Sequence, residues 1–549
     1  MALDPAFPLA RIRYILEDSQ AGLIVADGEH VALAQGLAPD GCRVLSTAAL
    51  DARLLSDDLS LRADPGSPAY LLYTSGSTGR SKGVVQIHRS RLHDVMTYTN
   101  GLHISPDDRL ALLYPYCTGM GTAIVLCALL NGATLCLYDM QGEGAARLAP
   151  WLVREEVTIF FSIPAVFRQL VGILTGREDF SRLRVLHVGT ERVSPRDVQL
   201  YRAHFPPGCI LVTGLASNET GRTCRYFVDK FSRLPDGGVP VGYPVDGVEV
   251  LLLDDDGHPV GSDQAGEIVV RSRYLSGGYW RRPELTEAAF RPDPAGGDAR
   301  LFRTGDLGLM LPDGCLFHRG RKDFRAKVRG YSVEGSEIEM ALLALGGIEE
   351  AVVVAREGPG GDQHLVAYLV PAGPPAPPAD ALRRALVERL PDYMIPSDFV
   401  WLHSLPRTPN GKVDRLALPA PGGGRPALSV PFVAPRNALE GRLAAIWAEV
   451  LGRGDVGIHD DFLELGGNSL LAMQVVSRVG DAWRVQVALP SLLAAPTVAQ
   501  MAVVVLQHLA VAEGPAGAER VLAEIEALPE AAAQAEPQRP GPEGDASTP

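Results

Sequence analysis

The sequence lacks the features of a metal-binding or disulfide-bonded protein. Its seven cysteines are scattered, and none forms a C-x-x-C pair, which argues against a zinc site and against a disulfide framework. It also lacks basic runs. Its 65 acidic residues outnumber the 51 basic ones and give a formal net charge of −14. A negative surface repels nucleic acid and anionic membranes, so we expect neither as a partner.

Long apolar segments are missing as well. The N-terminus has no basic region followed by an apolar stretch, so no signal peptide is expected. The most apolar window, Thr122 to Tyr138, is interrupted by Asn131 and Gly132 and falls short of a membrane span. The sequence therefore predicts a cytoplasmic protein. Its 549 residues, 46% of them hydrophobic, suit several globular domains.

The first part of the chain has the pattern of an α/β domain. Before residue 320, short apolar segments at 157–163, 183–189 and 209–214 alternate with amphipathic segments, which predicts buried strands between helices. The stretch 247–273 contains the turn signal DDDG between apolar runs, which favours a hairpin. We therefore expect residues 1–320 to form a large α/β core with a β-rich part.

Four further regions are expected after this core. Residues 321–418 contain two strand candidates and the amphipathic segment DALRRALVERL, which suit a small α+β domain. Residues 419–435 are rich in glycine and proline and predict a linker. Residues 436–510 have helical periodicity, and we expect a four-helix bundle there. The tail, residues 511–549, is rich in Ala, Glu and Pro and is predicted to be disordered.

The segment YTSGSTGRSKG, residues 73–83, places small polar residues directly after the apolar run AYLL. Such a loop allows backbone N–H groups to surround an anion, because the side chains stay out of the way. Its spacing differs from that of a Walker A loop. We predict a phosphate-binding loop of another type, with a flexible surface loop as the alternative. The candidate nucleotide-binding residues of this loop are Thr74, Ser75, Gly76, Ser77, Thr78, Gly79 and Lys82.

This loop resembles the signature loop of the adenylate-forming superfamily. The later stretches LFRTGDLG, GRKDFRAKVRGYSVEGSEIE, LPDYMIP and NGKVDR are similar to further motifs of that family, in the same order. DDFLELGGNSLL resembles the carrier-protein motif that receives phosphopantetheine. The chain thus resembles a nonribosomal peptide synthetase adenylation domain, with its small C-terminal lid domain, fused to a peptidyl carrier domain. The similarity begins only at LDPAFPLARIRYILEDS, so we expect the family's opening lobe to be missing.

The resemblance implies a nucleotide site. Asp306 would accept the ribose hydroxyls, since a diol suits a two-oxygen acceptor, and Arg321 would contact the same ribose. A simple turn carboxylate is the alternative for Asp306. Glu219 would lie near the Mg²⁺ that accompanies ATP, because this hard cation prefers oxygen ligands. Gly189 and Leu215 belong to the same implied site, and Leu215 replaces the aromatic ring that many relatives place beside adenine.

Three more roles follow from the resemblance. Lys412 would be the catalytic residue, because attack of a carboxylate on the α-phosphate builds negative charge that a positioned ammonium group stabilises. A solvated turn lysine is the alternative. Asp323 occupies the position of the family's domain hinge. Ser469 would carry phosphopantetheine at a helix N-terminus, where a phosphodiester is favoured; an ordinary N-cap serine is the alternative.

A substrate pocket also follows from alignment at ALLNGATL. Gly119 stands where amino-acid-activating relatives have an aspartate that pairs with the substrate's α-ammonium group, a buried charge that needs a partner. We therefore expect a substrate without an ordinary α-ammonium group: an aryl, hydroxy, keto or fatty acid, or an amino acid with its amine elsewhere. Arg222 suits an anionic or strongly hydrogen-bonding group, and exposure to solvent is its alternative. The implied pocket residues are Gly119, Met120, Ala123, Phe161, Leu186, Val188, Gly214, Arg222 and Thr223.

Together these features predict ATP-dependent activation of a carboxylic acid as an acyl-adenylate and its transfer to phosphopantetheine on Ser469. The expected cofactors are ATP, Mg²⁺ and 4′-phosphopantetheine. The expected partners are a phosphopantetheinyl transferase and downstream condensation or ketosynthase enzymes of nonribosomal peptide or hybrid biosynthesis. A ligase that uses free coenzyme A is one alternative, against which the fused carrier domain argues. An inactive scaffold is another, against which the retention of Lys412, Glu219 and Asp306 argues.

Overall fold

The computed structural model describes residues 1–513 except 51–60, 75–80, 263, 323–324, 359–362, 408–412, 416, 423, 427 and 429. The chain divides into two compact units, Met1–Gly422 and Gly423–Pro549. The division falls within the stretch expected to be a linker. None of the seven cysteines forms a disulfide, and the described part of the chain contains no helix long and apolar enough to cross a membrane.

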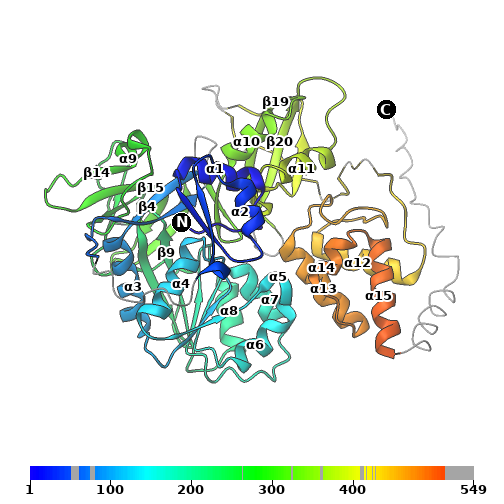
Figure 1. Cartoon of the computed structure of the whole chain (residues 1–549), viewed down its shortest axis with the longest axis horizontal. Coiled ribbons are helices and arrows are strands. Elements are labelled where there is room, and N and C mark those ends of the chain that lie inside the picture. The colour runs from blue at the N-terminus through cyan, green and yellow to red at the C-terminus, as the bar shows by residue number, and fades with distance from the viewer. Residues whose placement is uncertain are drawn as a thin grey trace, which may run out of the picture. The chain divides into compact units, whose positions relative to one another are not determined.

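A seven-stranded sheet forms the centre of the first unit (Figure 1). Neighbouring strands from β6 to β9 are parallel, whereas β10 pairs antiparallel with both β9 and β11. The three expected strands are β7, β8 and β9. Parallel strands are covered on both faces, which explains their continuous apolar sequences. In spatial order the sheet contains β11 (Tyr243–Pro244), β10 (Gly221–Val228), β9 (Ile210–Ser217), β8 (Val185–Val188), β7 (Ile159–Ser162), β5 (Arg109–Leu112) and β6 (Thr134–Leu137).

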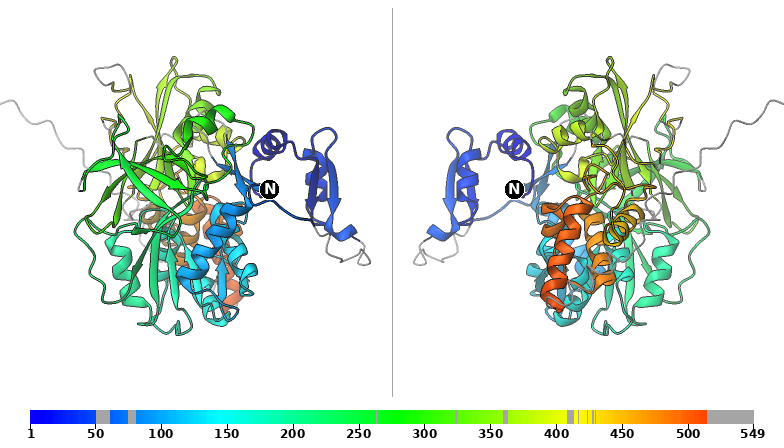
Figure 2. Two further views of the ribbon diagram at one scale, coloured as in Figure 1. Left: turned by 90° about the vertical axis from the view of Figure 1, so that its left-hand side faces the viewer. Right: turned by 90° about the vertical axis from the view of Figure 1, so that its right-hand side faces the viewer.

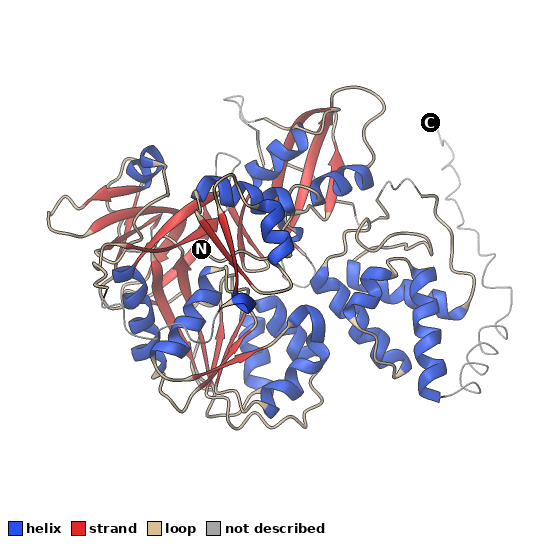
Figure 3. Cartoon of the chain, viewed as in Figure 1, coloured by secondary structure: helices blue, strands red, loops and turns tan. Residues whose placement is uncertain are grey.

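Helices cover both faces of this sheet (Figure 3). One face packs against α6 (Leu148–Arg154), α7 (Pro164–Gly172) and α8 (Pro195–His204) in a core that includes Phe160 and Phe167. The opposite face packs against α3 (His88–Leu102) and α4 (Gly119–Leu130), in a second core that includes Tyr98 and Phe161. The predicted α/β layering is confirmed.

The β-rich part is antiparallel, as the turn signals predict. β3 (Pro68–Thr74) and β4 (Lys82–Ile87) form a hairpin. A second sheet has the order β12-β13-β15-β14, with β16 paired to β15. Its strands are β12 (Glu249–Leu253), β13 (Ala265–Ser272), β14 (Phe290–Pro292), β15 (Arg300–Met310) and β16 (Leu316–Arg321), and α9 (Pro283–Ala289) precedes β14.

The small α+β region expected from residue 321 has its own hydrophobic core. A three-stranded sheet of order β19-β20-β21 packs with two helices, and a two-stranded hairpin precedes it. The elements are β17 (Arg325–Val328), β18 (Tyr331–Glu334), α10 (Gly335–Leu343), β19 (Ile348–Glu357), β20 (Gln363–Pro371), α11 (Ala379–Val387) and β21 (Asp398–Trp401).

The N-terminal segment forms a small parallel β-α-β element beside the rest of the first unit (Figure 2). It consists of α1 (Leu9–Ser19), β1 (Leu23–Ala26), α2 (Val31–Leu37) and β2 (Arg43–Ser46). The Arg11 guanidinium of α1 lies 3.3 Å from the carboxylate of Glu337 on α10. The Tyr14 hydroxyl donates to the carbonyl of Ser81 at 2.7 Å. These contacts join α1 both to the small domain and to the strand that follows the expected phosphate loop.

The second unit contains the expected helices. They are α12 (Ala438–Leu451), α13 (Ser469–Trp483), α14 (Leu489–Ala494) and α15 (Val498–Glu513). Asn437 caps α12 by accepting the Glu440 N–H at 2.9 Å, as the capping pattern predicts. Trp447 of α12 is fully buried and packs edge-on against Phe462, with ring centroids 5.0 Å apart. Residues 514–549, most of the predicted tail, lie outside the described residues.

Candidate nucleotide and acyl site

The expected phosphate loop connects two paired strands. Thr74 at the end of β3 faces Lys82 at the start of β4 in the ladder. The hydroxyl of Thr74 is buried and has no hydrogen-bond partner among the described residues, so it can bind a polar ligand. The loop residues Ser75, Gly76, Ser77, Thr78 and Gly79 lie outside the described residues.

Lys82 and Glu219 meet at a shared neighbour, Tyr279. The ammonium nitrogen of Lys82 lies 3.9 Å from the centroid of the Tyr279 ring. The Tyr279 hydroxyl donates to Oε1 of Glu219 at 3.0 Å. Glu219 is only 3% exposed. The fold therefore places a lysine of the loop and a buried carboxylate on the same tyrosine, an arrangement that suits a phosphate group and its Mg²⁺.

Asp306 and Arg321 form an ion pair between β15 and β16. Nη1 of Arg321 lies 2.6 Å from Oδ1 of Asp306, and Nε2 of His318 lies 3.1 Å from the same oxygen. Burial alone would raise the pKa of Asp306, but hydrogen bonding to His318 and the charge of Arg321 outweigh it and lower the pKa. The carboxylate is therefore ionised at neutral pH and can accept hydroxyl groups of a ligand.

The two other expected nucleotide residues lie on or directly after neighbouring strands. Gly189 follows β8 directly, and its N–H donates to the carbonyl of Ser162 at 3.1 Å. Leu215 lies on β9 and packs with the β-rich core around Val84 and Ile268. The carboxyl ends of parallel strands are where α/β sheets bind ligands, and Gly189 lies at this edge.

Several of the expected pocket residues surround Tyr98 of α3. The Tyr98 hydroxyl donates to Sδ of Met120 at 3.7 Å, and its ring lies 6.0 Å from that of Phe161. Ala123 belongs to the same buried cluster. The Arg222 guanidinium stacks over Tyr98 at 4.8 Å and the residue is 3% exposed. The side chain of Arg222 thus points inward, so its solvent-exposed alternative is wrong.

The expected positions on β8 are wrong by one residue. Leu186 and Val188 belong to the core on the opposite face of the sheet, because side chains alternate along a strand. His187, between them, faces the pocket: its ring lies 5.2 Å from that of Phe161, and it contacts Arg222 at 2.8 Å. The register between β7 and β8 shows that His187 faces the pocket, since it is the direct neighbour of Phe161.

The remaining expected pocket residues are small. A Cβ on Gly119 would lie 2.1 Å from Oδ1 of Asn218, so an amide occupies the space beside this glycine. A Cβ on Gly214 would lie 2.1 Å from the carbonyl oxygen of Cys224, which excludes any larger residue there. The hydroxyl of Thr223 lies 2.9 Å from that of Thr220.

Ser469 is the first residue of α13. The preceding Asn468 accepts the N–H of Leu471 at 3.1 Å, so Asn468 is a cap of this helix. A Cβ on Gly467 would lie 2.4 Å from the ring of Phe462, which explains the glycine in the motif. Asp460 has a structural role, because its buried carboxylate accepts bonds of 2.8 and 2.6 Å from Arg425.

Two further expected site residues fall in other undescribed segments. Lys412, the expected catalytic residue, and Asp323, the expected hinge, lie outside the described residues.

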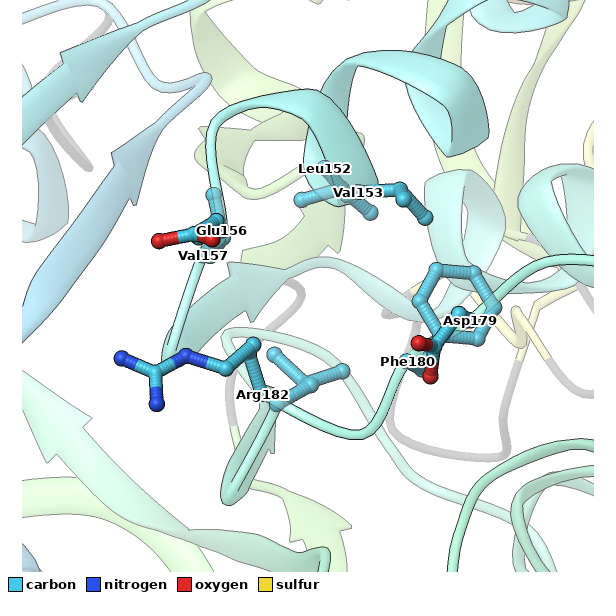
Figure 4. Close-up of a pocket in the computed structure, with 8 residues that line it drawn as sticks. Leu152, Val153, Glu156, Val157, Asp179, Phe180 and Arg182 are labelled. Carbon is cyan, nitrogen blue, oxygen red and sulfur yellow. The ribbon is translucent and has the colours of Figure 1, made fainter.

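A separate surface pocket borders α6 (Figure 4). It lies beside the core on the face of the sheet that carries Leu186 and Val188. None of the expected site residues lines it, and we assign it no function. Its lining residues are Leu152, Val153, Glu156, Val157, Asp179, Phe180, Arg182 and Leu183.

Comparison with known families agrees with this geometry. Residues 1–280 match the family described as AMP-binding enzyme. The chain belongs to this family. Residues 337–412 match the AMP-binding enzyme C-terminal domain, and residues 441–504 match the phosphopantetheine attachment site. The expected membership in the adenylate-forming superfamily and the presence of a carrier domain are confirmed.

This AMP-binding chain is similar to segments of much longer synthetases. It is 33% identical over 505 residues to tyrocidine synthase 2 of Brevibacillus parabrevis, which covers 91% of the chain and 14% of that protein. It is 32% identical over 486 residues to bacitracin synthase 2 of Bacillus licheniformis, covering 88% and 18%. The chain therefore spans less than a fifth of the length of either relative.

A solved structure shares both parts of the architecture. It is an NRPS protein containing adenylation and PCP domains, in its holo form with a vinylsulfonamide inhibitor. The two are 27% identical with a TM-score of 0.74, over 92% of this chain and 83% of the other. The α/β core of the AMP-binding chain and its helical carrier domain thus follow a known fold.

Proposed function

We propose that the protein uses ATP to activate a carboxylic acid as an acyl-adenylate and transfers the acyl group to the phosphopantetheine thiol on Ser469. One observation supports this proposal most strongly: Lys82 and Glu219 both contact Tyr279, in a chain that also contains a carrier domain. An enzyme that used free coenzyme A would have no need of a fused carrier domain.

Different residues of the core would bind the ribose, the phosphates and the Mg²⁺ of ATP. The ionised carboxylate of Asp306, held by Arg321 at 2.6 Å, would accept the ribose hydroxyls. Lys82 and the hydroxyl of Thr74 would bind phosphate oxygens at the mouth of the loop. Glu219 would hold Mg²⁺, which when bound neutralises phosphate charge. The buried hydroxyl of Thr74, which has no partner among the described residues, and the oxygen of Glu219 fit these ligands.

Two chemical steps follow from these assignments. An oxygen of the acid's carboxylate bonds to the α-phosphorus of ATP, and the bond to pyrophosphate breaks. Lys412 would stabilise the negative charge of this transition state. Phosphopantetheine on the carrier domain would supply the thiol that replaces AMP on the acyl carbon. Asn468 caps α13, which supports Ser469 as the attachment residue.

The wider context of the reaction is also a proposal. The named relatives are synthases of tyrocidine and bacitracin, which supports a place in the assembly of a nonribosomal peptide or hybrid product. A phosphopantetheinyl transferase would modify Ser469, and condensation or ketosynthase enzymes would take the acyl group. Seven unpaired cysteines suit a reducing compartment, and we place the reaction in the cytoplasm.

Acid-dependent exchange of pyrophosphate into ATP tests the first step. The account expects exchange with a subset of acids, equal in wild type and in Ser469→Ala, because the carrier serine takes no part in adenylation. Exchange that requires Ser469, or that proceeds without any acid, would contradict it. Production of acyl-coenzyme A in preference to acylated carrier would favour the alternative ligase.

A further inference from the structure

Two arginines of β10 bury their side chains together against α3. Arg222 is 3% exposed and Arg225 is 9% exposed. Residues three apart on a regular strand point to opposite faces. Here the register with β9 shifts between Arg222 and Cys224, and this bulge turns both arginines to the same face. Their guanidinium groups lie 4.8 and 5.7 Å from the centroid of the Tyr98 ring.

The cluster contains more positive than negative charge. Arg91 adds a third buried guanidinium group, and Asp94 provides a carboxylate. The oxygens of Asp94 accept the backbone N–H of Arg222 at 2.8 Å and Nη1 of Arg91 at 3.3 Å. In the part of the chain that the structure describes, no carboxylate oxygen lies within 4.0 Å of the guanidinium group of Arg222 or Arg225. Leaving buried cations unpaired costs several kcal/mol per group.

Several hydrogen-bond donors of the cluster have no acceptor among the described residues. Nη2 of Arg222 contacts the Tyr98 hydroxyl and, at 2.8 Å, Nε2 of His187. Because a guanidinium group can only donate, Nε2 must accept, and the proton of the neutral imidazole lies on Nδ1. Burial, reinforced by Arg222 and Arg225, holds the pKa of His187 well below 6.5. Among the described residues, Nδ1 of His187, Nε of Arg222, and Nε and Nη2 of Arg225 have no partner.

Glycines border these donors. Nδ1 of His187 lies 3.7 Å from the position of a Cβ on Gly189, and Nη1 of Arg222 lies 3.0 Å from that of Gly214. A Cβ on Gly101 would lie 1.5 Å from Nη1 of Arg225, so this guanidinium group depends on the glycine. A side chain at Gly189 would crowd the ring of His187, and one at Gly214 would crowd the guanidinium group of Arg222, so both glycines keep side chains away from the cluster.

We infer that Arg222, Arg225 and His187 recognise an anionic group of the substrate, and that the acid activated by this protein is a dicarboxylic acid. One carboxylate would react with ATP, and the other would accept hydrogen bonds from these donors. The inference rests on the proposed function and specifies its substrate class. It agrees with Gly119, since a dicarboxylic acid without an α-ammonium group needs no carboxylate there.

Pyrophosphate exchange by the wild-type chain, measured with pairs of acids, provides the first test. Each straight-chain dicarboxylic acid of three to six carbons is compared with its own monomethyl ester and with the common α-amino acids. A site built around buried donors rejects ligands that leave them unpaired, so at least one diacid should exceed its monoester by about 100-fold in kcat/KM. A monocarboxylic or α-amino acid as best substrate would overturn the inference and leave the proposed function intact. No exchange with any acid would overturn both.

Substitution of the arginine separates recognition from folding. Arg222→Met should lower kcat/KM for the diacid by about 100-fold and bring the ratio of diacid to monoester close to one. Arg154→Met, which removes an arginine whose side chain is 69% exposed on α6, should leave the ratio unchanged. Thermal unfolding of each variant checks its fold. If Arg222→Met does not fold, His187→Gln replaces it, and a wild-type ratio in a folded variant of either residue contradicts the inference.

Discussion

Nε2 of His187 on β8 lies 2.8 Å from Nη2 of Arg222 on β10, and both side chains are buried. The burial of His187 beside this guanidinium group makes the stability of the core sensitive to acid. The pKa of His187 lies well below 6.5 because of burial and the nearby charges of Arg222 and Arg225. Below about pH 6.5 the unfolded chain binds a proton that the folded chain does not, so the free energy of unfolding falls as the pH falls.

We predict that His187→Gln reduces this acid sensitivity. Between pH 7.5 and pH 5.5 the wild type should lose about 1 kcal/mol more stability than the variant. Denaturant unfolding of the chain at both pH values, followed for the transition of the first unit, measures this difference in stability. His258→Gln, which alters an exposed histidine, serves as the matched control and should behave as wild type. An equal pH dependence in His187→Gln and wild type would show that the imidazole is not held neutral.

Asp306→Asn should weaken the binding of ATP. The amide cannot pair with the charge of Arg321, which lies 2.6 Å from Oδ1, and it accepts ribose hydroxyls less strongly than a carboxylate. We expect KM for ATP to rise about 10- to 100-fold. Because the pKa of Asp306 is lowered, wild-type KM for ATP should show no titration of this group above pH 5. An unchanged KM in the variant would remove Asp306 from the nucleotide site.

Glu219→Gln should raise the Mg²⁺ concentration that half-saturates pyrophosphate exchange. A neutral amide is a weaker ligand for this hard cation than a carboxylate. Tyr279→Phe is the matched comparison, because it removes only the hydroxyl that donates to Glu219 at 3.0 Å and should have the smaller effect. A Mg²⁺ titration measures both variants. A larger effect from Tyr279→Phe would mean that the tyrosine acts on the nucleotide directly.

The role of Lys412 stays a prediction. Lys412→Ala should lower acid-dependent pyrophosphate exchange by about 10²- to 10³-fold, the usual cost of removing one charge contact from a transition state. Binding of ATP, measured by calorimetry, should be retained. Exchange near the wild-type rate would mean that another residue stabilises the transition-state charge.

The positions of strands could be predicted more easily than the faces of the strands. The apolar runs at β7, β8 and β9 were visible because both faces of a parallel sheet are buried. The same continuity hides which side chains share a face, and for that reason Leu186 and Val188 were expected in a pocket that His187 in fact lines. Only the register with Phe161 decides the question.

Other features depend on contacts between distant parts of the chain. No local pattern indicates the bulge that brings Arg222 and Arg225 to one face. Nor does any pattern place Tyr279 between Lys82 and Glu219. Asp306 and Arg321 were expected at one site from the family resemblance alone, and the structure places them opposite each other on adjacent antiparallel strands.

The most direct test of the account is the intact mass of the chain after two incubations. Coenzyme A and a phosphopantetheinyl transferase come first, followed by ATP, Mg²⁺ and the acid that gives the fastest exchange. We predict one mass increase for phosphopantetheine and a second for the acyl group, with neither in Ser469→Ala. Phosphopantetheine on the wild type without any acyl mass, or equal modification of Ser469→Ala, would contradict the central claim.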